Sequence, residues 1–140
     1  MSHRTLDELL AAARGKIERL EPADAWSAAQ NGGLIVDTRS DRSPGIVPGS
    51  LHVPLSVLQW RLAPDSAWRN PHAGSLETRL ILICEHGESS SLAAASLAEL
   101  GFTRVGDVVG GFEAWVAAGL PVAPAPSPAD GLPGMGGPSA

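Results

Sequence analysis

Short apolar runs recur along this chain, and segments with helical spacing separate them. The clearest runs are residues 34–37 and 80–83, and residues 16–20, 50–54 and 105–109 are further strand candidates. Runs this short suit β-strands, and the lack of polar alternation indicates strands covered on both faces. Strands that alternate with helices form a mainly parallel sheet with helices on both sides. The pattern therefore predicts an α/β fold with three layers.

The helical segments are marked by capping residues and by apolar spacing. Thr5 with Glu8 three residues later is typical of a capping box at the start of a helix. Residues 55–79 follow no regular pattern, and we expect Trp60 and Trp68 to anchor them in the core. The predicted helices cover residues 5–15, 22–30, 89–100 and 112–118.

Composition limits the class of protein and of partner. A chain of 140 residues is long enough for one domain with a hydrophobic core. Its net charge of −5, with no basic cluster, argues against nucleic acid or an anionic membrane as a partner. No apolar run approaches the roughly 20 residues of a membrane span, and the first residues lack the apolar stretch of a signal peptide. We therefore expect a cytoplasmic protein.

The ends of the chain differ in composition from its centre. Residues 1–15 form a predicted N-terminal helical extension, and residues 16–122 carry the strand and helix pattern. Residues 123–140 are rich in proline and glycine. A segment with so little apolar surface cannot offset the entropy of ordering, so we predict a disordered tail.

Cys84 is the only cysteine and stands where an apolar strand meets a polar loop. One cysteine cannot form an internal disulfide, and a reactive thiol is easiest to keep in a reducing compartment. A free cysteine is more often a small buried hydrophobe. Here, however, ligands are expected at the carboxyl end of the strand, and Gly87 allows a turn whose N–H groups bind an anion. The helix that follows adds its positive end, so we favour a reactive thiolate.

Four segments, taken together, resemble the rhodanese-type sulfurtransferases. Residues 84–90 match the family's loop pattern Cys-x-x-Gly-x-x-Ser, and small bacterial thiosulfate sulfurtransferases share the His-Gly pair and the two serines. The other segments are residues 37–39, with the pattern Asp-x-Arg, residues 47–54 and residues 110–122. Each motif alone is weak, but their order and spacing are specific. The resemblance implies a rhodanese-like three-layer domain over residues 16–122.

The resemblance also implies a two-step transfer of a sulfane sulfur. In this family the Cys84 thiolate takes sulfur from a donor such as thiosulfate or a persulfide and becomes a persulfide itself. A thiol or cyanide then removes the outer sulfur, and a protein is a further candidate acceptor. This is covalent catalysis in two easier steps, and it needs no cofactor. One cysteine and four histidines provide no paired spacing for a structural metal site.

The resemblance assigns roles to residues near Cys84. The loop residues are expected to surround the anionic sulfur, and Asp37 and Arg39 to support the loop, with a buried ion pair as the alternative. Ser89 and Ser90 either hydrogen-bond the persulfide or cap the following helix. His86 either shapes the loop or carries a proton. The predicted anion-binding loop comprises Glu85, His86, Gly87, Glu88, Ser89 and Ser90.

The loop departs from the family pattern in its charge. Ser89 stands where many rhodaneses carry an arginine, and Glu85 and Glu88 add negative potential that disfavours a dianionic donor. An alternative function is therefore a persulfide carrier or sulfur sensor without turnover. A cysteine phosphatase of the same fold is a weaker alternative, since its loop needs an arginine to clamp phosphate. Here Ser90 holds that position.

Overall fold

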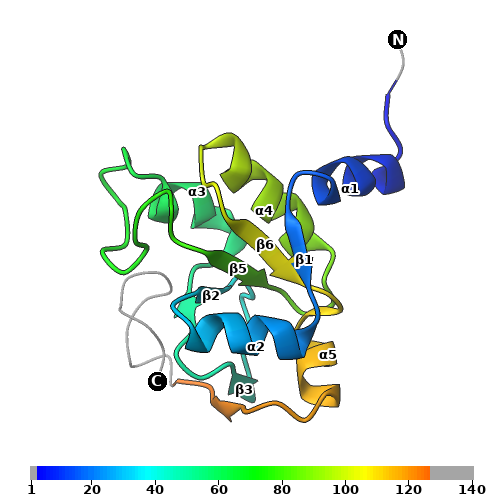
Figure 1. Ribbon diagram of the computed structural model, residues 1–140, viewed down its shortest axis with the longest axis vertical. Helices are drawn as coiled ribbons and strands as arrows, with labels where there is room; N and C mark the ends of the chain where they lie inside the picture. The colour runs from blue at the N-terminus through cyan, green and yellow to red at the C-terminus, as the bar shows by residue number, and fades with distance from the viewer. Residues whose placement is uncertain (1–2, 127–140) are drawn as a thin grey trace.

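The computed structural model describes residues 3–126 and has a five-stranded parallel sheet at its centre (Figure 1). The predicted α/β class is confirmed, because each neighbouring pair of strands in this sheet runs parallel. No helix among the described residues is long and apolar enough to cross a membrane. In spatial order the strands are β1 (Glu18–Leu20), β6 (Val105–Val108), β5 (Leu80–Ile83), β2 (Leu34–Asp37) and β4 (Leu51–His52).

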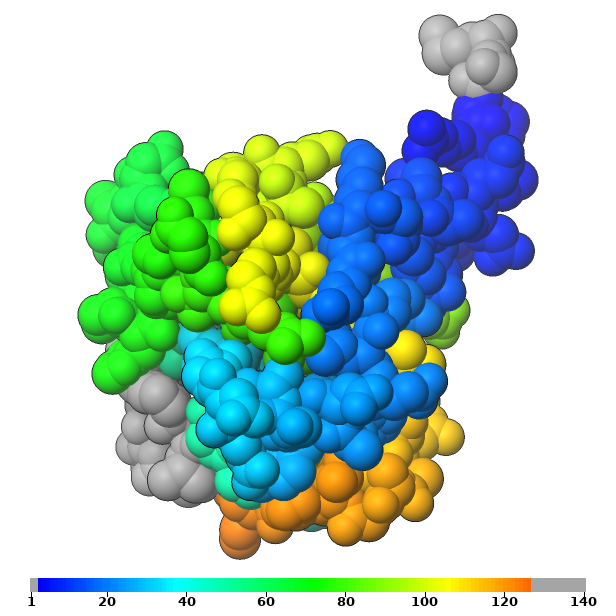
Figure 2. Space-filling view, in the orientation of Figure 1, coloured from blue at the N-terminus to red at the C-terminus, as the bar shows by residue number. Residues whose placement is uncertain are grey.

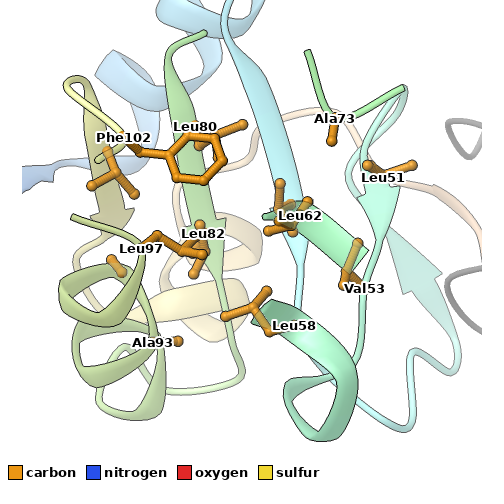
Figure 3. Packing of buried hydrophobic residues seen from close by; sticks show 13 residues of the cluster. Leu51, Val53, Leu58, Leu62, Ala73, Leu80, Leu82, Ala93, Leu97 and Phe102 are labelled. Atoms are coloured by element: carbon orange, nitrogen blue, oxygen red, sulfur yellow. The ribbon is translucent and has the colours of Figure 1, made fainter. Parts of the chain in front are cut away.

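Helices cover both faces of the sheet and make it the middle of three layers. The two faces are separated by the alternation of β5: Leu80 and Leu82 pack in one cluster, Ile81 and Ile83 in the other. Figure 3 shows the first cluster, where side chains of α3 and α4 face the sheet. The helices of this face are α3 (Leu58–Leu62) and α4 (Ser89–Glu99), and those of the other face are α2 (Pro22–Gln30) and α5 (Gly111–Ala117).

The central strand β5 is completely buried. All four of its side chains are 0% exposed, and burying each contributes about 1.5–3 kcal/mol. A strand held from both faces and paired on both edges has little freedom to move. Cys84 is the residue that follows β5, so its position is fixed by this buried strand.

The N-terminal helix α1 (Leu6–Arg14) lies at one edge of the molecule and packs against α4. Its predicted capping box is confirmed: the Glu8 N–H donates to Thr5 Oγ1 at 3.1 Å, and the Thr5 N–H donates to Glu8 Oε1 at 2.9 Å. In Figure 2 the start of this helix, in dark blue, projects from the body. Its last turn lies against the rest of the protein, since Arg14 is hydrogen-bonded to the loop after β5.

A second, two-stranded sheet and a 3₁₀ turn complete the fold. Strand β3 (Gly45–Ile46) pairs antiparallel with β7 (Ala123–Pro124), and η1 (Leu55–Val57) precedes α3. Residues 123 and 124 belong to the predicted disordered tail, but the structure pairs them with β3. Residues 127–140 of that predicted tail lie outside the described residues.

The expected tryptophan anchors are wrong. Trp60 and Trp68 are 59% and 69% exposed, while Leu58 and Leu62 of the same segment are fully buried. The two leucines are four residues apart and so share one face of α3, which turns Trp60 away from the core. Residues 55–79 follow no regular apolar pattern, so their sequence does not show which side of this short helix faces the sheet.

Candidate functional site

Cys84 follows the last residue of β5 at the carboxyl edge of the central sheet and is only 5% exposed. Asp37 ends the neighbouring strand β2 at the same level, since its register partner is Ile83. Open α/β sheets bind ligands at this edge. Residues 84–90, which we call the cysteine loop, lead from β5 into the first turn of α4.

Backbone N–H groups of the cysteine loop point at the sulfur. The Gly87 and Ser90 N–H groups donate to Cys84 Sγ at 3.1 and 3.4 Å, and Ser90 Oγ lies 3.2 Å from it. Converging amides of this kind form an anion-binding nest. The sulfur also lies beside the start of α4, where the helix dipole favours negative charge.

Gly87 is required at its position by both conformation and space. Its φ of +83° lies in the region that favours glycine. A Cβ atom there would come 2.6 Å from the Gly110 nitrogen, which belongs to the backbone and cannot give way easily. The loop can therefore approach the α5 segment closely only with glycine at position 87.

The pKa of the Cys84 thiol lies below its ordinary value. Burial of the sulfur acts in the opposite direction and raises the pKa, because it disfavours the charged form. Hydrogen bonds from the Ser90 and Ser89 hydroxyls and from the Ser90 and Gly87 N–H groups outweigh burial. The loop therefore stabilises a thiolate, which is the nucleophilic form of cysteine.

The reactivity of Cys84 should follow this lowered pKa. The fraction of thiolate rises as pH increases through the pKa, so alkylation by iodoacetamide should reach half its maximal rate below the roughly pH 8.5 of a free cysteine. Rates measured against pH test this, with a short unstructured cysteine peptide as the control. A midpoint equal to that of the peptide would contradict it.

The first residues of α5 donate backbone hydrogen bonds to the cysteine loop. The Phe112 N–H donates to the Cys84 carbonyl at 2.7 Å, and the Glu113 N–H donates to the Glu85 carbonyl at 3.1 Å. A Cβ on Gly111 would lie 2.5 Å from the Cys84 oxygen. The Gly-Gly pair of the fourth sequence motif thus allows the first turn of α5 to contact the loop backbone directly.

Asp37 and Arg39 form a buried ion pair that also reaches the loop. Arg39 Nη2 donates to Asp37 Oδ2 at 2.9 Å, and Nη1 donates to Glu85 Oε2 at 3.4 Å. The guanidinium carbon lies 3.9 Å from the centre of the Phe112 ring. The structure therefore brings both predicted supporting residues next to the cysteine loop. Arg39 connects Asp37 to the loop, because it pairs with both Asp37 and Glu85.

The other predicted loop residues divide into inner and outer groups. Ser90 is buried, and its hydroxyl is bonded to Cys84 and Asp107, so it does not cap α4. Glu88 and Ser89 are exposed, and the Ser89 hydroxyl acts in the direction that lowers the pKa of the Cys84 thiol. His86 also faces outward, and its Nδ1 lies 2.7 Å from Glu113 Oε2.

Asp107, a fully buried acid in β6, belongs to the site but is not among the residues predicted from the sequence. Its Oδ2 accepts hydrogen bonds from the Ser90 and Ser91 hydroxyls at 2.8 and 2.7 Å, and its Oδ1 accepts one from Arg19 Nε at 2.9 Å. A charged residue within a predicted buried strand was the available signal, because such a charge needs a partner. Nothing in the sequence identified Arg19 as that partner.

The described residues offer no metal-binding group. Within residues 3–126, no three side chains of His, Cys, Asp or Glu are arranged to hold a metal ion together. The chemistry that the geometry provides is that of one thiolate in a ring of hydrogen-bond donors. Such a site can attack an electrophile and can stabilise the negative charge on an atom added to the sulfur.

Comparison with known proteins agrees with this geometry. The rhodanese-like domain model matches residues 21–118. Thiosulfate sulfurtransferase GlpE of Pseudomonas paraeruginosa is 35% identical over 101 residues, which cover 70% of this chain and 83% of that protein. GlpE of Ectopseudomonas mendocina is 36% identical over 102 residues, covering 71% and 85%.

A solved structure with a similar fold comes from Rhodopseudomonas palustris. It is a protein of unknown function, described as a possible tyrosine phosphatase, with a TM-score of 0.78 and 29% identity. The similarity covers 88% of this chain and 97% of that one. The family match spans most of the central sheet, the cysteine loop and α5, and the GlpE relatives span a similar length. This chain therefore belongs to the rhodanese-like family.

Proposed function

We propose that this protein is a sulfurtransferase that carries a sulfane sulfur on Cys84. The observation that supports this most directly is the hydrogen-bonded sulfur at the base of the cysteine loop. Gly87 and Ser90 donate to it from the backbone, and its pKa is lowered despite burial. The GlpE relatives, named as thiosulfate sulfurtransferases, support the same activity.

The proposed reaction needs no cofactor and no external oxidant. The Cys84 thiolate attacks the outer sulfur of thiosulfate, the bond between the two donor sulfurs breaks, and sulfite leaves with the electron pair. An acceptor thiolate or cyanide then attacks the outer sulfur of the persulfide, and the Cys84 thiolate leaves. In both half-reactions a negative charge stays near the cysteine loop, where N–H donors stabilise it.

The charges around the cysteine loop influence which sulfur donor can bind there. Ser89 provides no cation for a dianion, but Glu85 is paired with Arg39 at 3.4 Å, so the loop is less acidic than its sequence suggests. We propose that thiosulfate is a donor, as the names of the GlpE relatives suggest, and that a low-molecular-weight persulfide is a second. The acceptor is a thiol in this proposal, and cyanide replaces it in an assay.

Intact-mass spectrometry tests the proposal. Purified protein incubated with thiosulfate, and separately with a persulfide, should gain the mass of one sulfur atom and lose it when cyanide is added. Thiocyanate should form in repeated turnovers. Protein that never gains sulfur from either donor, under conditions where a GlpE protein does, would falsify the proposal. Loading without turnover would favour the carrier alternative.

A phosphatase is the second candidate, because the Rhodopseudomonas palustris structure is described in those terms. Residues 84–90 contain no arginine to clamp a phosphate with two hydrogen bonds. We therefore expect no hydrolysis of p-nitrophenyl phosphate above the background of a Cys84→Ser variant. Hydrolysis that depends on Cys84 would reverse the order of the two candidates.

A further inference from the structure

A closed ring of hydrogen bonds connects the cysteine loop to the N-terminal part of the chain. Arg14 Nη2 donates to the Gly87 carbonyl at 2.9 Å, and Arg14 Nε donates to Ser91 Oγ at 3.1 Å. Ser91 Oγ donates to Asp107 Oδ2 at 2.7 Å, Arg19 Nε donates to Asp107 Oδ1 at 2.9 Å, and Arg19 Nη2 returns to the Gly87 carbonyl at 2.9 Å. We call these five residues the Gly87 ring.

The Gly87 ring restrains the residue of the cysteine loop whose backbone has the greatest conformational freedom. Gly87 lacks a Cβ, so its backbone can rotate more freely than that of any other residue in the loop. Its N–H donates to Cys84 Sγ, while its carbonyl accepts from two guanidinium groups. Hydrogen bonds from a charged donor are stronger than neutral ones. Gly87 is thus restrained on both sides, and its N–H is kept directed at the sulfur.

Ser90 links the ring to the sulfur through a single hydroxyl proton. Its Oγ lies 2.8 Å from Asp107 Oδ2 and 3.2 Å from Cys84 Sγ. When Cys84 is a thiol, its S–H donates to Ser90 and Ser90 donates to Asp107. When Cys84 is a thiolate, Ser90 can donate to the sulfur only if other donors satisfy Asp107. Arg19 and Ser91 are those donors.

Both arginines precede the family match, which begins at residue 21. Arg14 is the last residue of α1, and Arg19 is the middle residue of β1. Helix α1 reaches this position by packing against α4, the helix that carries Ser90 and Ser91. The N-terminal segment therefore contributes to the site through two side chains that lie outside the matched residues.

We infer that Arg14 and Arg19 are positioning residues that hold Gly87 and Asp107 in the arrangement that donates hydrogen bonds to Cys84. The inference rests on the proposed function, in which Cys84 is the nucleophile. Neither arginine is assigned a contact with the substrate. Helix α1 thus contributes Arg14 to the sulfur site.

Arg14 is the residue to test, because its removal leaves the Arg19–Asp107 pair intact. Arg14→Ala should lower the rate of iodoacetamide alkylation below the thiolate midpoint by about threefold to tenfold, since half a pKa unit to one unit changes the thiolate fraction by that factor. The rates should converge at high pH. A merely structural role would leave this pH profile unchanged.

Lys16→Ala is the matched control. Lys16 is two residues away, carries the same charge, is 53% exposed and pairs only with the exposed Glu99 among the contacts the structure shows within residues 3–126. Both variants retain the charged and titratable groups nearest the loop. These are Arg19 on β1, Asp37 at the end of β2, Arg39 just after it, Glu85, His86 and Glu88 in the loop, Asp107 on β6 and Glu113 on α5.

A shift in Arg14→Ala without a shift in Lys16→Ala supports the inference. An unchanged midpoint in Arg14→Ala, or equal shifts in both variants, overturns it. Should Arg14→Ala fail to fold by circular dichroism, Arg14→Lys decides: it keeps the charge but cannot span Gly87 and Ser91, so its midpoint should rise, and a wild-type midpoint overturns the inference. Alkylation needs no sulfur donor, so a protein that never loads sulfur refutes the proposed function separately.

Discussion

Replacing Cys84 with serine is expected to abolish sulfur loading and to lower sulfurtransferase turnover by on the order of 10⁴-fold or more, as is typical when a covalent nucleophile is removed. A serine hydroxyl is not ionised near neutral pH, and no base that the structure shows within residues 3–126 contacts the sulfur position to activate it. The loop would then bind a donor without forming a covalent bond to it.

The fold should survive this change. The two side chains differ by one atom, and a serine oxygen can accept the hydrogen bonds that Gly87 and Ser90 now donate to sulfur. We expect the free energy of unfolding to change by about 1 kcal/mol or less. Urea unfolding followed by circular dichroism checks this, and intact-mass spectrometry checks loading. A Cys84→Ser protein that still gains sulfur would refute the role of Cys84.

Replacing Gly87 with alanine is expected to have the second largest effect. The left-handed backbone of this residue costs alanine about 1–2 kcal/mol, and the new methyl group would meet the Gly110 backbone at 2.6 Å. The loop must move to relieve the contact, which takes the Gly87 N–H away from the sulfur. We expect turnover to fall by about 10²-fold, the usual cost of a displacement near 1 Å.

Gly119→Ala separates the cost of conformation from the effect on the site. Gly119 has a φ of +71°, close to that of Gly87, but a Cβ added there would meet no atom within 4 Å apart from its own chain neighbours. Both variants should lose the same free energy to the left-handed backbone, while only Gly87→Ala carries the added contact with Gly110 and should lose turnover and raise the midpoint of alkylation. Equal turnover in the two variants would show that the Gly87 geometry does not matter for catalysis.

Local patterns predicted most of the secondary structure correctly. The apolar run at residues 80–83 forms β5 as expected, and the capping box at Thr5 starts α1. Residues 16–20 were a less obvious strand, yet β1 lies within them at residues 18–20. These features depend on neighbours within a few residues, which a sequence displays directly.

The errors arise where the environment of a side chain depends on a distant segment. Trp60 and Trp68 are the expected anchors of residues 55–79, but two leucines of α3 occupy that face of the sheet. Residues 123 and 124 were assigned to a disordered tail by composition, yet β3 provides a partner for their backbone. Pairing with a strand about 80 residues away leaves no local signal.

Local sequence patterns were enough to predict the α/β class, the position of Cys84 at the end of a strand and the motif order of a rhodanese-like domain. The residues that surround the cysteine loop became known only from the packed structure. Arg14 and Arg19 lie 73 and 68 residues from Gly87, and Arg19 lies 88 residues from Asp107. No sequence spacing predicts which group an arginine will bind, because its long side chain reaches a carbonyl or a carboxylate only after the sheet and helices have packed.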